Sequence, residues 1–246
     1  MSMRPGCLLL MIAMMAGAED RHSPVVVELF TSEGCSSCPP ADRLLADLVR
    51  RQTSAAPVIA LSEHVDYWNH LGWRDPYSSS VFSNRQQAYG EVFRTTDVYT
   101  PQMVVDGLAN FNGSDAEQAR KSIQLAARQP KVRVEVTRKD SEGRVSILVD
   151  NLGAAQTDKA DVFLAVTENN LESSVHAGEN AGHTLQHTAV VRSLVRIVQI
   201  EAKRGAYTAD MKVGLQPGWR VNNSSAVVFV QDRKTRRIIG AAICSL

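Results

Sequence analysis

Two cysteines separated by two serines, Cys35 and Cys38, are the residues of this 246-residue chain whose types and spacing best suit chemistry. Thiols three positions apart can close a small disulfide at the start of a helix, where the helix dipole and free backbone N–H groups favour the thiolate of the first cysteine. Cys35 would then attack or be attacked in thiol–disulfide exchange, and Cys38 would resolve the mixed disulfide. An inert disulfide that staples the helix start is the alternative, whereas a four-cysteine zinc site is excluded because the sequence holds no second such pair.

The residues on either side of the pair predict the elements that position it. The run VVVELF (25–30) is nearly all apolar, which is typical of a central strand covered on both faces. The stretch after the cysteines, ADRLLADLVRRQ (41–52), has apolar residues at helical spacing. Pro39 and Pro40 are tolerated only in the first turn of a helix, so they place the helix start near Cys35.

Thr100 and Pro101 directly precede a third predicted strand, 103–105. A proline there can adopt a cis peptide bond, which would set backbone against the sulfur pair and offer an edge for an extended substrate. The alternative is a trans proline that only starts the strand. Asp106-Gly107 then predicts a hairpin turn and a brief fourth strand.

The order of patterns predicts two domains. A second short strand at 58–62 and helices at 78–94 and 115–128 complete an α/β domain over 24–129 with helices on both faces of its sheet. In the last helix, Ile123 and Leu125 are expected to face inwards. From residue 131 short alternating strands predict an antiparallel β-sandwich-like domain over 130–246, in which 190–204 favours strand because of its β-branched content.

The first 18 residues have the form of a secretory signal peptide, with one charge, an apolar run and a small-x-small cleavage site. We therefore expect a secreted or periplasmic protein without a membrane span after cleavage; an uncleaved anchor is the alternative. Cys7 would leave with the signal, and Cys244 would be a buried structural thiol. A net charge of +1 and 44% hydrophobic residues exclude disordered and collagen-like classes and give no reason to expect nucleic acid as a partner.

Glu28 is the ionisable residue of the first predicted strand and precedes Cys35 by seven positions. If it were buried beneath the disulfide, it could accept a proton from Cys38. The alternative is that Glu28 pairs with a cation.

The segment EHVDYWNH (63–70) follows the second strand, and ligands gather at the carboxyl ends of strands in open α/β sheets. Asp66 and Trp68 are therefore expected to shape a substrate groove near the cysteines. His64 could instead join the two thiolates in a copper site, because two thiolates and one imidazole suit a soft metal.

A glycine-rich stretch of the second domain holds a further group of polar residues: His176, Glu179, Asn180, His183 and His187. Its histidines could supply a metal site. The alternative is a structured loop whose side chains bond backbone and which packs on the first domain.

Residues 25–128 resemble a thioredoxin-like domain, on the order strand, Cys-x-x-Cys, helix, strand, Thr-Pro, hairpin and final helix. The mature chain is also similar to a family of secreted, mostly bacterial proteins catalogued as a thioredoxin-like domain of unknown function. The stretches that carry this resemblance are VELFTSEGCSSCPPAD, HVDYWNHLGWRDPYS, YTPQMVVDG and GENAGHTLQHTAVVR. The resemblance implies a fold and a compartment but no reaction, and the Ser-Ser between the cysteines departs from the Gly-Pro of thioredoxins.

These observations predict an exported thiol–disulfide oxidoreductase-like protein that acts on protein thiols or disulfides of exported proteins. Cys35 and Cys38 would exchange, Pro101 and Thr100 would position substrate, and no cofactor is implied. The alternatives are a copper-binding metallochaperone and a non-catalytic binding module with a structural disulfide.

Overall fold

The computed structural model describes residues 24–51, 57–95, 97–150, 152–155, 157–201, 203 and 205–246. The expected signal peptide and Cys7 lie outside the described residues. The helices are α1 (Pro39–Arg50), α2 (Ser80–Phe93) and α3 (Ala116–Ala127). The strands are β1 (Val25–Thr31), β2 (Val58–His64), β3 (Gln102–Val105), β4 (Ala109–Asn112), β5 (Arg133–Arg138), β6 (Arg144–Asp150), β7 (Lys159–Glu168), β8 (Leu171–Ser174), β9 (Thr184–His187), β10 (Val190–Glu201), β11 (Tyr207–Lys212), β12 (Ser224–Asp232) and β13 (Ile238–Ser245).

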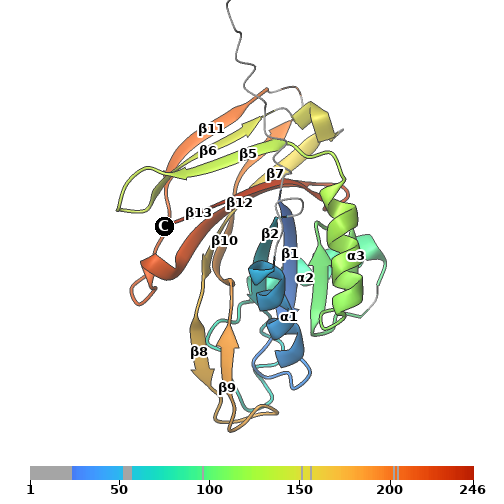
Figure 1. Ribbon diagram of the computed structural model, residues 1–246, viewed down its shortest axis with the longest axis vertical. Helices are drawn as coiled ribbons and strands as arrows, with labels where there is room; N and C mark the ends of the chain where they lie inside the picture. The colour runs from blue at the N-terminus through green and yellow to red at the C-terminus, as the bar shows by residue number, and fades with distance from the viewer. Residues whose placement is uncertain are drawn as a thin grey trace, which may run out of the picture.

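Within the described ranges, eight strands form one mixed sheet in the order β13-β12-β7-β10-β2-β1-β3-β4. β1 runs parallel to β2, and β10 joins β2 in parallel at a single pair, Val190 with Ser62; the other neighbours are antiparallel. β11, β6 and β5 form a smaller antiparallel sheet, and β8 and β9 form a separate ribbon (Figure 1). The protein is therefore mixed α/β, with one large mixed sheet and smaller antiparallel sheets.

Helices cover both faces of the β1–β4 part of this sheet, as the sequence predicts. α1 and α3 share a core with one face of β1, and α2 packs on the other face. Ile123 faces inwards as expected, but Leu125 is 62% exposed. The reason is that the buried stripe of α3 runs through Ala119, Ile123 and Ala126 at helical spacing, and position 125 falls outside it.

The two predicted halves of the chain share the large sheet and also share a core. Val26 and Leu61 of the first half pack in one cluster with Val191 and Phe229 of the second. A second core lies between β5, β6 and β11 on one side and β7, β12 and β13 on the other (Figure 1). The division of the chain at residue 130 stays a prediction, and residues from both sides of it pack together.

Several local predictions agree with the structure. The β3–β4 hairpin turns at Asp106 and Gly107, both left-handed, and a Cβ on Gly107 would lie 2.1 Å from the carbonyl oxygen of Arg236. β10 confirms that the 190–204 stretch favours strand. The Thr100–Pro101 peptide bond is cis. In the part of the chain that the structure describes, no helix is both long and apolar enough to cross a membrane.

Candidate functional site

Cys35 and Cys38 form a disulfide in the turn that connects β1 to α1. The Cys38 N–H donates to the Cys35 carbonyl at 3.1 Å, and Cys38 is the N-cap of α1. The helix therefore begins after the pair, at Pro39, and not near Cys35 as the sequence suggested. Because Pro39 and Pro40 carry no N–H, the first turn of α1 offers fewer backbone donors to a thiolate than expected.

Both sulfur-bearing residues are buried, with Cys35 and Cys38 each 0% exposed, whereas Ser36 and Ser37 between them are exposed. The Ser37 hydroxyl lies 3.3 Å from the Cys35 sulfur. It donates this hydrogen bond, because a sulfur in a disulfide holds no hydrogen. Burial of the sulfurs means that this conformation presents the serines, and not the disulfide, to solvent.

The turn between β8 and β9, residues 176–183, lies against the disulfide loop and is called here the β8–β9 turn. The Ser36 N–H and hydroxyl both donate to Oε2 of Glu179, at 3.0 and 2.7 Å. The buried side chain of Asn180 donates to the carbonyls of Glu33 and Cys35, at 2.8 and 3.0 Å. The expectation that this stretch is a structured loop packed on the first half agrees with these contacts.

Trp68, Thr100 and Pro101 lie beside the disulfide loop. Trp68 Nε1 donates to the Thr100 hydroxyl at 2.8 Å. A Cβ on Gly34 would lie 3.2 Å from the Cβ of Trp68, so residue 68 packs against the residue directly before Cys35. A Cβ on Gly113 would lie 3.0 Å from both Pro101 and Ala41, which places Pro101 next to the first turn of α1.

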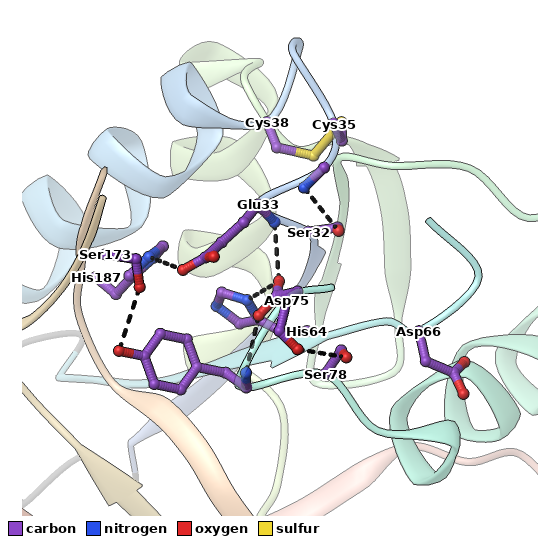
Figure 2. Close-up of polar contacts among 12 residues, drawn as sticks. Ser32, Glu33, Cys35, Cys38, His64, Asp66, Asp75, Ser78, Ser173 and His187 are labelled. Atoms are coloured by element: carbon purple, nitrogen blue, oxygen red, sulfur yellow. Dashed lines mark hydrogen bonds and ion pairs between the residues drawn. A yellow bond between two sulfur atoms is a disulfide. The ribbon is translucent and has the colours of Figure 1, made fainter. Parts of the chain in front are cut away.

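Asp66 does not join this group. Its Oδ1 accepts from the Ser83 hydroxyl at 2.5 Å, and its N–H donates to the same hydroxyl at 3.1 Å. Figure 2 shows the Asp66 carboxylate pointing away from the disulfide. Asp66 therefore ties its loop to the start of α2, and nothing places it against a substrate.

Glu28 is not beneath the disulfide. Its oxygens accept from Arg85 Nε and from the Tyr89 hydroxyl, both at 2.5 Å and both on α2. Because side chains alternate along β1, Val27 and Leu29 face α1 while Glu28 faces the opposite side of the sheet. The alternative, in which Glu28 pairs with a cation, is the one that the contacts support.

This Arg85 cluster is fully buried. The Arg85 guanidinium lies 3.6 Å from Glu63 and over the rings of Tyr89, Phe163 and Phe229, with its carbon 5.1 to 5.4 Å from their centroids. Burial, and then the charge of Glu28, raise the pKa of Glu63 well above its usual value. When Glu63 is protonated, it can donate to the Glu28 carboxylate. The Arg85 cation then lies beside one negative charge instead of two.

A second buried group, the histidine cluster, lies on the side of the sheet that carries α1. His187 Nε2 pairs with Glu33 at 2.9 Å, and His64 Nδ1 pairs with Asp75 at 2.7 Å. The two imidazole rings meet edge to face with centroids 5.0 Å apart. Asp75 also accepts from the Glu33 N–H at 2.9 Å, which ties the cluster to the segment that leads to Cys35 (Figure 2).

Asp42, one turn after Cys38 on α1, completes the histidine cluster. Burial raises its pKa, and the charges of His64 and His187 oppose that shift. For His64, burial alone would lower the pKa, but the charges of Asp75, Asp42 and Glu33 outweigh it and raise the pKa. Asp42 Oδ1, His64 Nε2 and His187 Nδ1 are buried without a hydrogen-bond partner among the described residues.

The copper hypothesis finds no support in this arrangement. The two cysteines are joined to each other, and His64 is held by Asp75 within the histidine cluster. His176 and His183 are exposed; His176 meets the edge of Trp73. Across the described ranges, no three His, Cys, Asp or Glu side chains gather in a way that could hold a metal ion.

Sequence reasoning missed the acids of the site. Glu33, Asp42 and Asp75 carry no local pattern that marks them, and their partners lie far along the chain: Glu33 meets His187 across 154 positions. The alternation of side chains along β1 could have shown that Glu28 lies on the opposite face from Val27 and Leu29.

Comparisons with solved structures agree on the fold. A crystal structure of a protein from Agrobacterium tumefaciens, solved by structural genomics, matches with a TM-score of 0.69 and 27% identity over 89% of this chain and 92% of that one. HBP35 of Porphyromonas gingivalis matches with a TM-score of 0.61 and 17% identity, over 92% of this chain and 76% of that one. The second likeness shows the fold alone.

No curated protein matches the chain. A family model described as "Protein of unknown function (DUF1223)" matches residues 26–231, which is most of the sequence and includes the disulfide, both buried clusters and the β8–β9 turn. The chain therefore belongs to the DUF1223 family.

Proposed function

We propose that this protein is an exported thiol–disulfide oxidoreductase whose reactive pair is Cys35 and Cys38. The observation that carries the proposal is the disulfide itself, in the turn between a buried strand and a helix, with Trp68 against Gly34, Thr100 bonded to Trp68, and Pro101 next to the first turn of α1. The partners would be thiols or disulfides of other exported proteins.

A thioredoxin-like unit over 24–129 is part of the proposal. It is supported by the strand order β2-β1-β3-β4, in which β1 pairs in parallel with β2 and antiparallel with β3. It is supported further by the placement of α1 and α3 on one face and α2 on the other. The β-rich remainder would extend this unit through the shared sheet.

The exchange reaction balances within the pair and its substrate. In the reduced protein, the Cys35 thiolate attacks a substrate disulfide, forms a mixed disulfide and releases one substrate thiolate. Cys38 loses its proton and attacks the Cys35 sulfur, which releases the second substrate thiolate and forms the Cys35–Cys38 bond. The substrate gains two electrons and the protein loses two, and the reverse sequence oxidises a substrate dithiol.

Two neighbours suit this chemistry. The Ser37 hydroxyl, which lies against the Cys35 sulfur, would stabilise the thiolate by donating to it. Asp42 would take the place that the sequence gave to Glu28, because it is a half-buried acid, with a buried Oδ1, on the helix that follows Cys38. Its raised pKa suits a group that holds a proton for part of the cycle.

A structural staple is the second candidate, and one observation favours it: both cysteines are 0% exposed. Structural disulfides resist the glutathione pool, whereas exchange disulfides do not. The two candidates therefore differ in whether a folded partner can reach the sulfurs.

Trapping with Cys38→Ser separates the candidates. We expect the variant to form a mixed disulfide through Cys35 with exported proteins in an oxidising extract, detected by non-reducing electrophoresis and mass spectrometry. The experiment is done in a Cys244→Ser background, because Cys244 is a thiol outside the disulfide. Cys35→Ser in the same background is the matched control; equal adduct levels in both variants would support the staple and contradict the proposal.

A further inference from the structure

The β8–β9 turn lies against the disulfide loop, and few polar contacts join the two. Its residues Gly178, Glu179 and Ala181 to His183 are exposed, and Asn180 is buried. The polar contacts of this turn with residues 33–36 come from two side chains, Glu179 and Asn180. Elsewhere the turn packs on Trp73, through the ring of His176 and through Gly178, where a Cβ would lie 3.3 Å from the Cβ of Trp73.

The strands that carry this turn are not part of the large sheet. β8 and β9 pair with each other in a ribbon of their own, which extends beside the start of α1 (Figure 1). The tip of the ribbon can thus move without breaking a hydrogen bond of the large sheet. Motions of this kind, with a hinge at a few loop residues, are typical of segments that close over a site.

We propose that the β8–β9 turn is a built-in lid on the Cys35–Cys38 disulfide, latched by Glu179 and Asn180, and that the sulfurs become accessible only when it lifts. The inference deepens the proposed function, because it reconciles an exchange disulfide with complete burial. The Asn180 amide bonds the carbonyls of Glu33 and Cys35, so a substrate cannot take the place of this amide while the turn is closed.

The hydrogen bonds of Glu179 and Asn180 also define which groups a substrate must supply when the turn moves away. Ser36 needs an acceptor for its N–H, now supplied by the Glu179 carboxylate, and Glu33 needs a donor for its carbonyl, now supplied by the Asn180 amide. An extended polypeptide carries an acceptor and a donor on each residue. A protein segment can therefore take over both contacts as the lid leaves.

The test is the rate at which dithiothreitol reduces the disulfide of the folded protein, followed by thiol labelling and mass spectrometry. We expect Asn180→Ala to speed reduction by at least about tenfold, because two hydrogen bonds of the closed state are lost. Glu179→Ala, at an exposed residue, should speed reduction several-fold. Hydrogen exchange at the Ser36 N–H should accelerate in parallel.

Glu172→Ala is the matched control, since Glu172 is an exposed glutamate on β8 that bonds Gln186 and not the disulfide loop. Its rate should equal that of the unaltered protein. The proposal is overturned if both latch variants also reduce at that rate, or if their acceleration only follows a loss of global stability in urea.

The reduction assay keeps the lid and the proposed function apart. Dithiothreitol reports access to the sulfurs whatever their role in the cell. Faster reduction in the latch variants without any trapped partner in Cys38→Ser would retain the lid and contradict the exchange function. A trapped partner with unchanged reduction rates would support the exchange function and contradict the lid.

Discussion

The two faces of the sheet each bury a cluster of charged residues, and the clusters differ in what they are tied to. The Arg85 cluster packs a guanidinium among three aromatic rings and two glutamates, far from the disulfide face. The histidine cluster joins β2, α1 and β9 through His64, Asp42 and His187, and includes the Glu33 segment that leads into Cys35. One face therefore uses buried charge to hold α2 on the sheet, and the other places titratable groups beneath a sulfur pair.

The largest expected effect tests the structural side of this comparison. Arg85→Met should destabilise the protein by about 3–5 kcal/mol, because it leaves two buried acids without their cation. Urea unfolding at neutral pH measures the loss. Arg120→Met, at an exposed position of α3, is the control. If Arg85→Met lost no more stability than Arg120→Met, the structural role of the Arg85 cluster would be contradicted.

Glu63→Gln should sharpen the same comparison through its pH dependence. The raised pKa of Glu63 means that the folded state keeps its proton, so this contribution to stability is complete below the unfolded pKa of about 4.3 and declines as pH rises towards the folded pKa. Glutamine donates to Glu28 at every pH. The variant should gain on the unaltered protein by up to about 1.4 kcal/mol per pH unit above that point.

Urea titrations of both proteins from pH 4 to 8 measure this difference. Parallel stability curves would show that Glu63 is ionised in the folded state, and the proton-sharing account of the Arg85 cluster would then be wrong.

On the other face, Asp75→Asn should lower the pKa of His64, since it removes the charge that raises this pKa most. Because the folded pKa of His64 is raised, its imidazolium stabilises the fold below about pH 6.5, and the effect is lost as pH rises through the folded pKa. The Asp75→Asn variant should lose this stabilisation at a lower pH than the unaltered protein. NMR titration of the His64 imidazole measures the change in pKa. Asp66→Asn is the control: Asp66 bonds Ser83, so this substitution should leave the pKa of His64 unchanged.

The smallest effect concerns the Cys35 thiol. Ser37→Ala should raise the pKa of this thiol in the reduced protein, because the hydroxyl can no longer donate to the thiolate. Alkylation rates as a function of pH measure it. Ser36→Ala is the paired control, since that hydroxyl donates to Glu179; an equal shift in both variants would remove Ser37 from the site.

Local patterns predicted what is locally encoded. The Cys-x-x-Cys pair and the Asp106-Gly107 hairpin each depend on neighbours within a few residues. The placement of Glu28 went wrong because a role was assigned from distance along the chain, although the alternation of β1 puts it on the face of α2.

The remaining features depend on contacts that no local pattern carries. Glu179 reaches Ser36 across 143 positions, and β10 joins β2 at one pair from the far half of the chain. The sequence could therefore identify the cysteine pair but not the β8–β9 turn that bonds its loop.

The reduction potential of the Cys35–Cys38 pair, measured in glutathione buffers with the protein folded, tests the central claim most directly. An exchange disulfide should equilibrate with a potential between about −270 and −120 mV, the range of proteins that trade disulfides. A potential below about −300 mV, or no reduction until the protein unfolds, would mean that the pair is a structural staple.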